Sequence, residues 1–441
     1  MSYFRLSPDC LLAEGGNGAA LYDVRNQRVY LLDGRAYRFL RHCENNGRVD
    51  EKECVTGAAL LAQLESEGLG AFEPAPAFID KWLPSSPVRP KGFLGPAPRY
   101  RMVYWSITNR CLLDCSFCGT EGTVTWQTCL TCLRRDRGRG DGPCIANVEE
   151  TIGQLAKLNV ETIVVRGGDP FLALDRLREI RAAVLRRPRI MLVVVSPGLA
   201  RTAEEILDFL NSPRVRLLIV LFGLDAVTTR TVTGHDDVHE RQRMLLGILR
   251  DRRLAFHSTM LLTEATRERH EDIADEWRRQ WGTAPQFAEC YEHEMLRRGG
   301  RFVIPQPGAK RLAPWLSPRE FFWRIQNKPC LYGQFEIDLG GSIRPCPGLS
   351  EVCGEIRNDD LRRALMARTL YDRWWSMSKS SVKSCSNCAL RFACNDCATV
   401  EILGAADPAV KQAYCSYDPD SDEMTHERAW SPPEFVKILR G

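Results

Sequence analysis

The sequence predicts an α/β protein whose centre is a partial (β/α)6 barrel, a parallel sheet that curls toward a closed barrel. From residue 104 onward, short apolar runs alternate with longer runs that have the apolar spacing of amphipathic helices. The predicted strands are 104–108, 162–166, 191–196, 217–221, 255–261 and 286–290, and the predicted helices include 148–158, 172–187, 203–210, 238–251 and 268–281. Asn147 followed by Glu150 predicts the capped start of the first helix. Right-handed crossovers make such strands parallel, so chemistry is expected at their carboxyl ends.

Residues 1–80 are predicted to form a small separate domain with a winged-helix-like arrangement. Strand-like runs at 19–22 and 28–32 flank a turn, and two helical patterns follow at 35–43 and 56–67. Residues 81–100 belong to a proline-rich stretch, which predicts an extended linker because proline breaks both helix and sheet. The barrel domain is then expected at 101–305 and a cysteine-rich domain at 306–441.

Composition excludes several classes of protein. The chain has 441 residues, 44% hydrophobic and 26% charged, which is ordinary for globular domains. A formal charge of +4 is no reason to expect a nucleic-acid partner. The apolar runs are too short to span a membrane and the amino terminus lacks a secretion signal, so we expect a cytoplasmic protein. Eighteen cysteines in such a chain indicate metal coordination rather than disulfides.

The most informative stretch is the loop after the first predicted barrel strand, where Cys111, Cys115 and Cys118 are separated by three and then two residues. Three thiolates in one short loop make a site for a soft metal. A tetrahedral zinc site would need a fourth ligand nearby. An iron–sulfur cluster held by three cysteines instead leaves one iron open to a small molecule, which favours a reactive cluster.

This motif, with an aromatic residue before its third cysteine and Thr-Asn-Arg before its first, resembles that of the radical S-adenosylmethionine (SAM) enzymes. The resemblance implies that Cys111, Cys115 and Cys118 hold a 4Fe-4S cluster and that SAM binds the fourth iron. It also implies that Phe117 lies near the adenine. The alternative, a zinc knuckle or three buried thiols, remains open at this stage.

Three further loops follow strands of the predicted barrel. Gly167-Gly168-Asp169 resembles the Gly-Gly-Glu motif that holds the amino group of SAM, with a carboxylate one methylene shorter. Ser196 takes the place of a turn that faces SAM in the family. Asp225 matches the carboxylate of the family's Ser-Leu-Asp-Gly motif and is our candidate catalytic residue, with a simple turn residue as the alternative.

An insertion at 119–146 carries Cys129, Cys132 and Cys144. The spacing of the first two is typical of chelation, and Cys144 could join them, which leaves one coordination position for water, a substrate thiolate or Cys290. The alternative is a loop of reduced thiols, and its Arg/Gly-rich part is expected to be solvated.

The last third of the chain holds the other large group of cysteines, whose order resembles the SPASM domain of radical SAM peptide maturases. The resemblance implies two auxiliary 4Fe-4S clusters and therefore three clusters in all. Auxiliary cluster I would be held by Cys330, Cys346 and Cys397, with Cys353 as a candidate fourth ligand. The implied ligands of auxiliary cluster II are Cys385, Cys388, Cys394 and Cys415.

Residues 29–40 resemble the precursor-peptide recognition domain found with many peptide-modifying radical SAM enzymes. In those domains a leader peptide adds as a strand to an exposed sheet edge. A DNA-binding winged helix is the rival, but the second helix lacks a basic face. A packing domain without a ligand is the other alternative.

Together these features predict a radical SAM/SPASM enzyme that crosslinks a ribosomally made precursor peptide through a carbon–carbon, ether or thioether bond. The resemblance implies a ferredoxin or flavodoxin as reductant and a 5'-deoxyadenosyl radical as the agent that abstracts hydrogen. Tyr291 and His293 follow the last predicted strand, and we expect them to face the substrate on the ground of this position alone. Alternatives are oxidation of a protein side chain, as in sulfatase maturases, and a zinc-binding regulatory protein.

Overall fold

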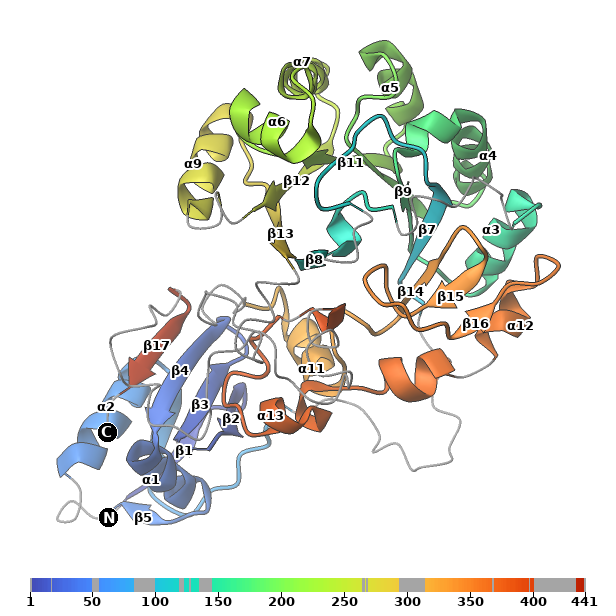
Figure 1. Cartoon of the computed structure of the whole chain (residues 1–441). Helices are drawn as coiled ribbons and strands as arrows, with labels where there is room; N and C mark the ends of the chain where they lie inside the picture. The colour runs from blue at the N-terminus through green and yellow to red at the C-terminus, as the bar shows by residue number, and fades with distance from the viewer. Residues whose placement is uncertain are drawn as a thin grey trace.

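The fold was analysed in a computed structural model of the chain (Figure 1). It describes residues 2–439 except 17, 50–54, 83–99, 119–122, 127, 135–144, 264–265, 267–268, 293–313, 367–368, 396 and 400–433. Cys144, His293 and Cys415, which were predicted site residues or neighbours of the site, therefore lie outside the described residues.

Six neighbouring strands form the parallel centre of a ten-stranded sheet, in the order in which they occur along the chain. They are β7 (Met102–Thr108), β9 (Thr162–Gly167), β10 (Met191–Ser196), β11 (Val215–Leu221), β12 (Phe256–Leu262) and β13 (Gln286–Glu292). The helices between them are α3 (Val148–Lys157), α4 (Leu174–Leu185), α5 (Ala203–Leu210), α6 (Ala226–Thr233), α7 (Val238–Asp251) and α9 (His270–Trp281). The α/β class and every predicted strand of the centre are confirmed.

Alternating side chains explain how these strands separate two cores. On β7, Val103 and Trp105 pack under the helices, whereas Tyr104 between them joins a second buried cluster on the opposite face. Neighbouring residues of a strand point to opposite faces, so an all-apolar strand must be covered on both sides. The helices cover the outer face (Figure 1). The loop with the first three cysteines covers the inner one.

Local sequence signals define the helix starts. Asn147 caps α3, since its side chain accepts a hydrogen bond from the Glu150 amide at 3.0 Å, as predicted. Asp225 caps α6 and Thr202 forms a capping box at α5 with Glu205.

The sheet extends beyond the six predicted strands at both edges. On the β7 side, β14 (Gln334–Ile337) pairs in parallel with β7, and β15 (Ser342–Arg344) and β16 (Gly354–Glu355) follow it. On the other side, β8 (Thr123–Trp126) pairs antiparallel with β13. The predicted insertion at 119–146 is therefore partly a strand, and the cysteine-rich C-terminal region shares the sheet of the barrel domain.

The N-terminal region contains two small sheets and two helices. One sheet has the order β5-β1-β6, formed by Arg48–Val49, Ser2–Leu6 and Gly70–Glu73. The other contains the antiparallel strands β2 (Cys10–Glu14), β3 (Gly18–Asp23) and β4 (Arg28–Asp33). The two helices are α1 (Gly34–Glu44) and α2 (Val55–Ser66), close to the predicted bounds.

The far end of the chain returns to this second sheet. Strand β17 (Val436–Leu439) pairs in parallel with β4, which gives the order β17-β4-β3-β2. Lys437 strengthens the pairing through an ion pair with Glu67, with an Nζ–Oε2 distance of 2.9 Å. The edge of β4, which the sequence indicated to be open to a peptide, is therefore occupied by the chain's own C-terminal strand.

The N-terminal region also packs against the cysteine-rich region. The Tyr22 hydroxyl donates to the Ala389 carbonyl at 2.7 Å, and the indole N–H of Trp315 donates to the Val24 carbonyl at 2.8 Å. Both rings are fully buried in a cluster shared with Phe321 on α11 (Pro318–Gln326). Removing residues 1–80 would therefore expose this cluster, so point variants and short truncations test the region more sharply than its deletion.

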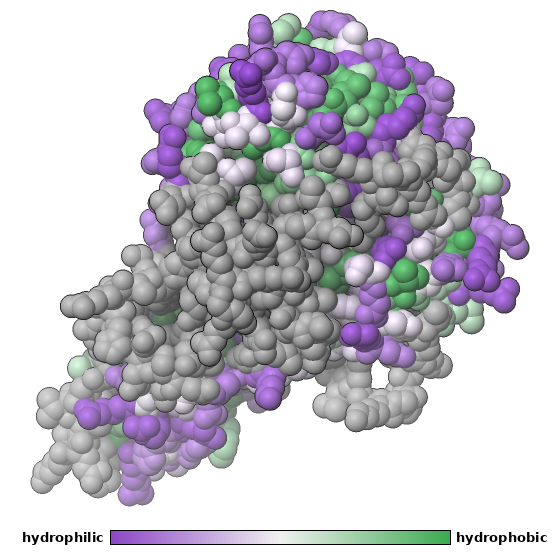
Figure 2. Space-filling view, in the orientation of Figure 1, coloured by the Kyte–Doolittle hydropathy of each residue, from purple (hydrophilic) through white to green (hydrophobic). Residues whose placement is uncertain are grey.

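The visible outer surface of the barrel domain is mainly hydrophilic, with small apolar patches between the charged helices (Figure 2). Within the described residues, no helix has the length and apolar character needed to cross a membrane.

Candidate active site

The three cysteines predicted to hold the reactive cluster lie together in one pocket. Cys111, Cys115 and Cys118 line a hollow of about 250 Å³, part of it open to solvent, with Phe117 and Cys132 among its other walls. Backbone contacts shape the loop, since the Cys118 amide donates to the Cys115 carbonyl at 3.1 Å. Phe117 packs 6.4 Å from Phe222 between ring centroids.

Gly167 at the end of β9 and Gly168 directly after it allow the cysteine loop to approach the sheet. Gly167 has a positive φ of 131°, and a side chain there would meet the Thr108 carbonyl oxygen at 2.2 Å from its Cβ. A Cβ on Gly168 would lie 2.0 Å from the Arg110 carbonyl oxygen. Neither obstacle is a flexible side chain, so only glycine lets β9 end directly beside the cluster loop.

Asp169 is buried at the edge of this pocket with one oxygen satisfied and one not. Its Oδ1 accepts hydrogen bonds from the Ser196 hydroxyl at 2.8 Å and from the Phe171 amide at 3.2 Å. Its Oδ2 has no hydrogen-bond partner among the described residues. Burial raises the pKa of the Asp169 carboxyl, while the Ser196 hydroxyl and the backbone amides of Phe171, Ala200 and Leu199 act in the opposite direction. A buried oxygen of this kind fits a cationic ligand such as an ammonium group.

Ser196 was predicted to face SAM, and the structure brings it to Asp169. The Ser196 hydroxyl donates a hydrogen bond to Asp169 and accepts one from the Gly198 amide at 2.9 Å. Ser196 therefore orients the carboxylate.

The donor set fits a 4Fe-4S cluster with SAM on its open iron. Burial raises the pKa values of the Cys111 and Cys115 thiols, and the neighbouring cysteines add to the rise. Such thiols are stable as thiolates only beside a compensating positive charge, which bound iron supplies. No three His, Cys, Asp or Glu side chains among the described residues are grouped for a single metal ion. A four-iron cube is larger than one ion, so its ligands stand farther apart.

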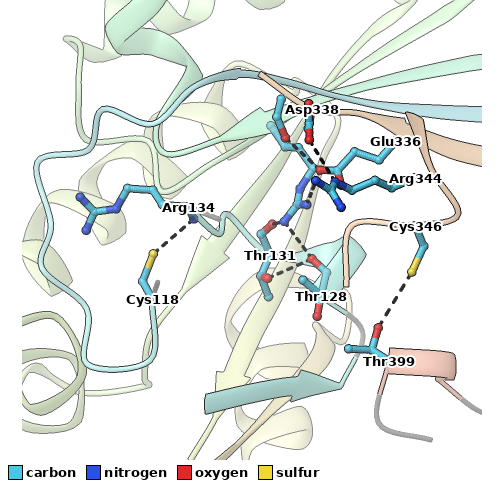
Figure 3. A network of polar contacts seen from close by, with 11 residues as sticks. Cys118, Thr128, Thr131, Arg134, Glu336, Asp338, Arg344, Cys346 and Thr399 are labelled. Carbon is cyan, nitrogen blue, oxygen red and sulfur yellow. Dashed lines mark hydrogen bonds and ion pairs between the residues drawn. The ribbon is translucent and has the colours of Figure 1, made fainter. Parts of the chain in front are cut away.

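A basic residue that the sequence did not single out closes the loop. The Arg134 amide donates to Cys118 Sγ at 3.4 Å, and its guanidinium donates to the Leu113 carbonyl at 3.0 Å (Figure 3). Arg134 lies two residues after the insertion's Cys132, at the start of the Arg/Gly-rich part that was expected to be solvated, yet its side chain is only 11% exposed. Only the folded path of the chain reveals its place.

A second missed feature is a buried ion pair behind the pocket. The Arg166 guanidinium lies 3.5 Å from Glu336 Oε1, and both side chains are only 2% exposed. Arg166 also donates to the carbonyls of Thr128 and Thr131, at 3.1 and 2.9 Å. Ser106 donates to the same Glu336 oxygen at 3.0 Å. This network ties β7, β9 and β14 to the turn that carries Cys129.

The predicted pair Cys129 and Cys132 packs in the same buried cluster as the cysteines of the loop. Cys132 lines the pocket of the first three cysteines. Burial raises the pKa of the Cys132 thiol, and the three neighbouring thiols raise it further. Burial raises the pKa of Cys129 to about 11, and the Cys397 thiol adds to the rise. Cys144 lies outside the described residues, so the prediction that the two thiols chelate one ion together with it stays a prediction.

The predicted auxiliary ligands that the structure describes fall into separate groups. Cys346 lies after the β14–β15 hairpin, with its Sγ 3.9 Å from the Thr399 hydroxyl and with Cys397 as its strongest electrostatic neighbour. Cys385 and Cys388 share a turn, in which the Cys388 amide donates to the Cys385 carbonyl at 3.0 Å. Cys394 ends the same loop.

Two other predicted ligands lie apart from these contacts. Cys330 begins the turn before β14 and packs against the main core. Cys353 is buried, and its charged neighbours are Glu351, Arg373 and Arg344 rather than other cysteines.

Asp225, the predicted catalytic carboxylate, has a structural role as the N-cap of α6. Its Oδ1 accepts from the Thr228 amide at 2.7 Å and its Oδ2 from the Thr228 hydroxyl at 3.1 Å. Hydrogen bonding to the Thr228 amide lowers the pKa of the Asp225 carboxyl. Both oxygens are thus engaged, and a catalytic role for this residue stays a prediction.

Replacing Asp169 by Asn is expected to weaken SAM binding by roughly 10- to 100-fold, because a hydrogen bond to a charged group contributes about 1.5–3 kcal/mol. Isothermal titration of the reconstituted protein with SAM measures this directly. The matched control is Asp175→Asn, the same change at a fully exposed carboxylate on the following helix. Equal affinity of both variants would contradict the assignment of Asp169 to the ammonium group.

Comparisons with known proteins agree with this geometry. The family model of the radical SAM superfamily matches residues 105–276. The solved structure of anSMEcpe with bound AdoMet and the Cp18Cys peptide has a TM-score of 0.51 at 13% identity, and the match covers 71% of this chain and 94% of that one. SuiB from Streptococcus suis has a TM-score of 0.47 at 13% identity, with 94% and 99% covered. No curated protein sequence matches the chain. At 13% identity the likeness to anSMEcpe shows the fold alone.

Proposed function

We propose that this chain, whose residues 105–276 match the family model of the radical SAM superfamily, is a radical SAM peptide maturase that crosslinks a ribosomally made precursor peptide. The observation that carries the proposal is the pocket lined by the three clustered thiols and by Gly167 and Gly168, directly before the buried carboxylate of Asp169. A reduced 4Fe-4S cluster with bound SAM would supply a 5'-deoxyadenosyl radical there. The chain's own residues hold the thiolates, orient the ammonium group and keep water from the buried side of the pocket.

The peptide substrate and the auxiliary clusters rest on further support. The solved structures similar in fold include one whose name records a bound peptide. Of the described cysteines in the C-terminal region, four are buried and three are partly exposed; the buried ones are Cys346, Cys353, Cys385 and Cys388. In the proposed reaction the peptide loses one hydrogen atom to the deoxyadenosyl radical. Bond closure then releases a proton and one electron, and an auxiliary cluster would accept that electron.

The proposal is tested by sequencing the reading frames next to the gene for a short precursor and by incubating a synthetic copy of it with anaerobically reconstituted enzyme, SAM and dithionite. We expect 5'-deoxyadenosine together with a peptide product lighter by two hydrogen atoms. A ferredoxin or flavodoxin should replace dithionite. Formation of a peptide aldehyde without a crosslink would favour the side-chain oxidation of the sulfatase-maturase type instead. Colourless protein that contains zinc and no iron would contradict the proposal altogether.

The N-terminal sheet is our proposed binding site for the leader of the precursor, in competition with β17. Four residues of β17 already add to β4, and Val436 and Leu439 are buried there. This edge therefore accepts an extended segment with apolar side chains on both faces, since Val436 and Leu439 pack into two different clusters. A leader that takes the place of β17 would make the same backbone hydrogen bonds and fill the same apolar positions.

Removing residues 435–441 should raise the affinity of this edge for a peptide, because an intramolecular competitor is lost. The probe is a fluorescent peptide with the sequence of residues 435–441, which should bind the truncated chain at least roughly tenfold more tightly than the full chain. The precursor should displace it. A Lys437→Ala variant keeps the strand but loses the ion pair with Glu67, so it should fall between the two. Equal binding to all three proteins would show that this edge is not the docking site.

A further inference from the structure

The turn between β2 and β3 lies against the loop 385–394, which carries three of the predicted auxiliary ligands. The Gly16 amide of this turn donates to the Asn387 carbonyl of the loop at 3.1 Å. A Cβ on Gly15 would lie 2.9 Å from the Ala389 amide nitrogen, so a side chain there would displace the loop. The N-terminal sheet is therefore in direct backbone contact with the cysteine-rich region.

The Tyr22 hydroxyl holds the backbone of this loop from the buried side. Tyr22 lies on β3, and its side chain is fully buried. The hydroxyl donates to the Ala389 carbonyl at 2.7 Å and accepts from the Phe392 amide at 3.3 Å. Buried backbone groups need a hydrogen-bond partner, so one hydroxyl fixes two points of the loop. The first directly follows Cys388, and the second lies two residues before Cys394.

Arg391 makes a second bridge between the loop and the sheet. Its Nη1 donates to the carbonyl of Glu14, the last residue of β2, at 2.7 Å. The same nitrogen donates to the Cys388 carbonyl at 2.8 Å. The hairpin and the backbone of a predicted cluster ligand therefore share one guanidinium nitrogen.

The Cys388 side chain lies in a buried apolar core that the N-terminal sheet helps to form. Cys388 is 8% exposed, and Tyr22 from β3 and Val436 from β17 belong to the same core. Figure 1 shows α13 (Lys383–Ser386), from which the loop continues, beside β2. Cys385 and Cys388 are both buried and two residues lie between them, a spacing typical of chelation. The loop thus fits a metal cluster whose surroundings include the N-terminal sheet.

We infer that the N-terminal sheet forms part of the auxiliary cluster site built on Cys385 and Cys388, and that Tyr22 is a positioning residue of this site. The inference rests on the proposed function, which includes the auxiliary clusters. The potential of a 4Fe-4S cluster depends on the hydrogen bonds to its sulfurs and on its exposure to water. Both depend on the path of the loop backbone, which Tyr22 fixes at two points.

The contact also relates the proposed peptide-binding edge to the auxiliary cluster. Strand β17 pairs with β4 at this edge, and its Val436 packs in the apolar core that contains Cys388. A leader that replaces β17 would put a side chain of its own in the place of Val436. The packing around the loop would then change, so the potential of the proposed electron acceptor would depend on whether a peptide is bound.

The test measures the midpoint potentials of the auxiliary clusters by redox titration followed by electron paramagnetic resonance. The background is the chain with Cys111, Cys115 and Cys118 replaced by Ala, in which only auxiliary clusters contribute a signal. Tyr22→Phe keeps the ring in the core and removes both hydrogen bonds of the hydroxyl, so the loop loosens and water reaches the cluster more easily. Reduction adds negative charge, which water stabilises, so one midpoint potential should rise while the iron content stays near roughly 8 per chain.

Gly15→Ala is a second, independent perturbation, because its Cβ pushes against the loop backbone and leaves the buried core unaltered. It should shift the same midpoint potential as Tyr22→Phe. One matched control is Tyr3→Phe, which removes a hydroxyl that accepts from Arg48 Nε at 3.0 Å in the other N-terminal sheet. The other is Gly247→Ala, whose Cβ has open space around it. Both controls should leave the potentials unchanged.

Removing residues 435–441 should shift the same midpoint potential, and adding the peptide with that sequence should reverse the shift. If only the point variants act, the relation to the peptide-binding edge is refuted. The whole inference is overturned if Tyr22→Phe and Gly15→Ala leave both potentials as in the background, or if the two controls shift them equally. A background protein without iron would instead refute the auxiliary clusters of the proposed function, and the inference with them.

Discussion

A chain in which Cys111, Cys115 or Cys118 is replaced by Ala is expected to form no detectable 5'-deoxyadenosine when it is reduced with dithionite in the presence of SAM. All three thiols line one pocket beside Asp169 and the glycines of β9. A cluster with an open iron needs all three protein ligands, because loss of one removes the iron arrangement to which SAM binds. The measurement is chromatographic detection of 5'-deoxyadenosine from reconstituted protein.

The matched control for this experiment is Cys43→Ala, which removes a fully buried thiol from α1 in the N-terminal region. It makes the same chemical change far from the pocket and should leave SAM cleavage intact. Cleavage that persists in any of the three cluster variants would show that the pocket does not hold the reactive cluster.

The largest expected effect on stability comes from the buried pair of Arg166 and Glu336. Replacing Arg166 by Ala leaves a buried carboxylate without its charge partner and frees two carbonyls of the turn at Cys129. Breaking a buried pair in this way costs about 3–5 kcal/mol. We expect the midpoint of urea unfolding of the reconstituted protein, measured by tryptophan fluorescence, to fall to a much lower urea concentration. We also expect the variant to lose auxiliary iron.

A surface pair of similar geometry provides the comparison. Arg230 and Asp236 are 3.1 Å apart but 67% and 75% exposed, so Arg230→Ala should cost less than about 1 kcal/mol. If the two arginine variants unfolded at the same urea concentration, the buried network would not support the turn as described.

Local sequence patterns predicted most of the barrel domain. The strands around Val103 and Ile163 are recognisable because apolar runs of this length are buried on both faces only in parallel sheets. Caps such as Asn147 act within a few residues, so they can be read from the chain directly. The strand β8 was missed, because its four residues pair with β13 over a long separation and have no pattern of their own.

In the N-terminal sheet, too, local pairing could be predicted from the sequence and long-range pairing could not. The hairpin of β3 and β4 was predicted from a turn between two apolar runs, which is a local feature. Its fourth strand comes from Val436–Leu439 at the other end of the chain, and no local pattern relates the two. The sequence therefore predicted a free edge at β4, whereas in the fold β17 pairs with that edge.

The sequence by itself determined the cysteine loop at 111–118, the Gly-Gly-Asp motif after β9 and the α/β class, because each depends on residues that are neighbours in the chain. Only the tertiary structure decided which thiols share a site. It brought Cys132 into the pocket of Cys111, Cys115 and Cys118 and packed Cys129 against the same buried cluster. The physical reason is that spacing in sequence limits how far apart two thiols can lie. The direction in which each one points is set by long-range contacts such as that of Arg166 with the turn.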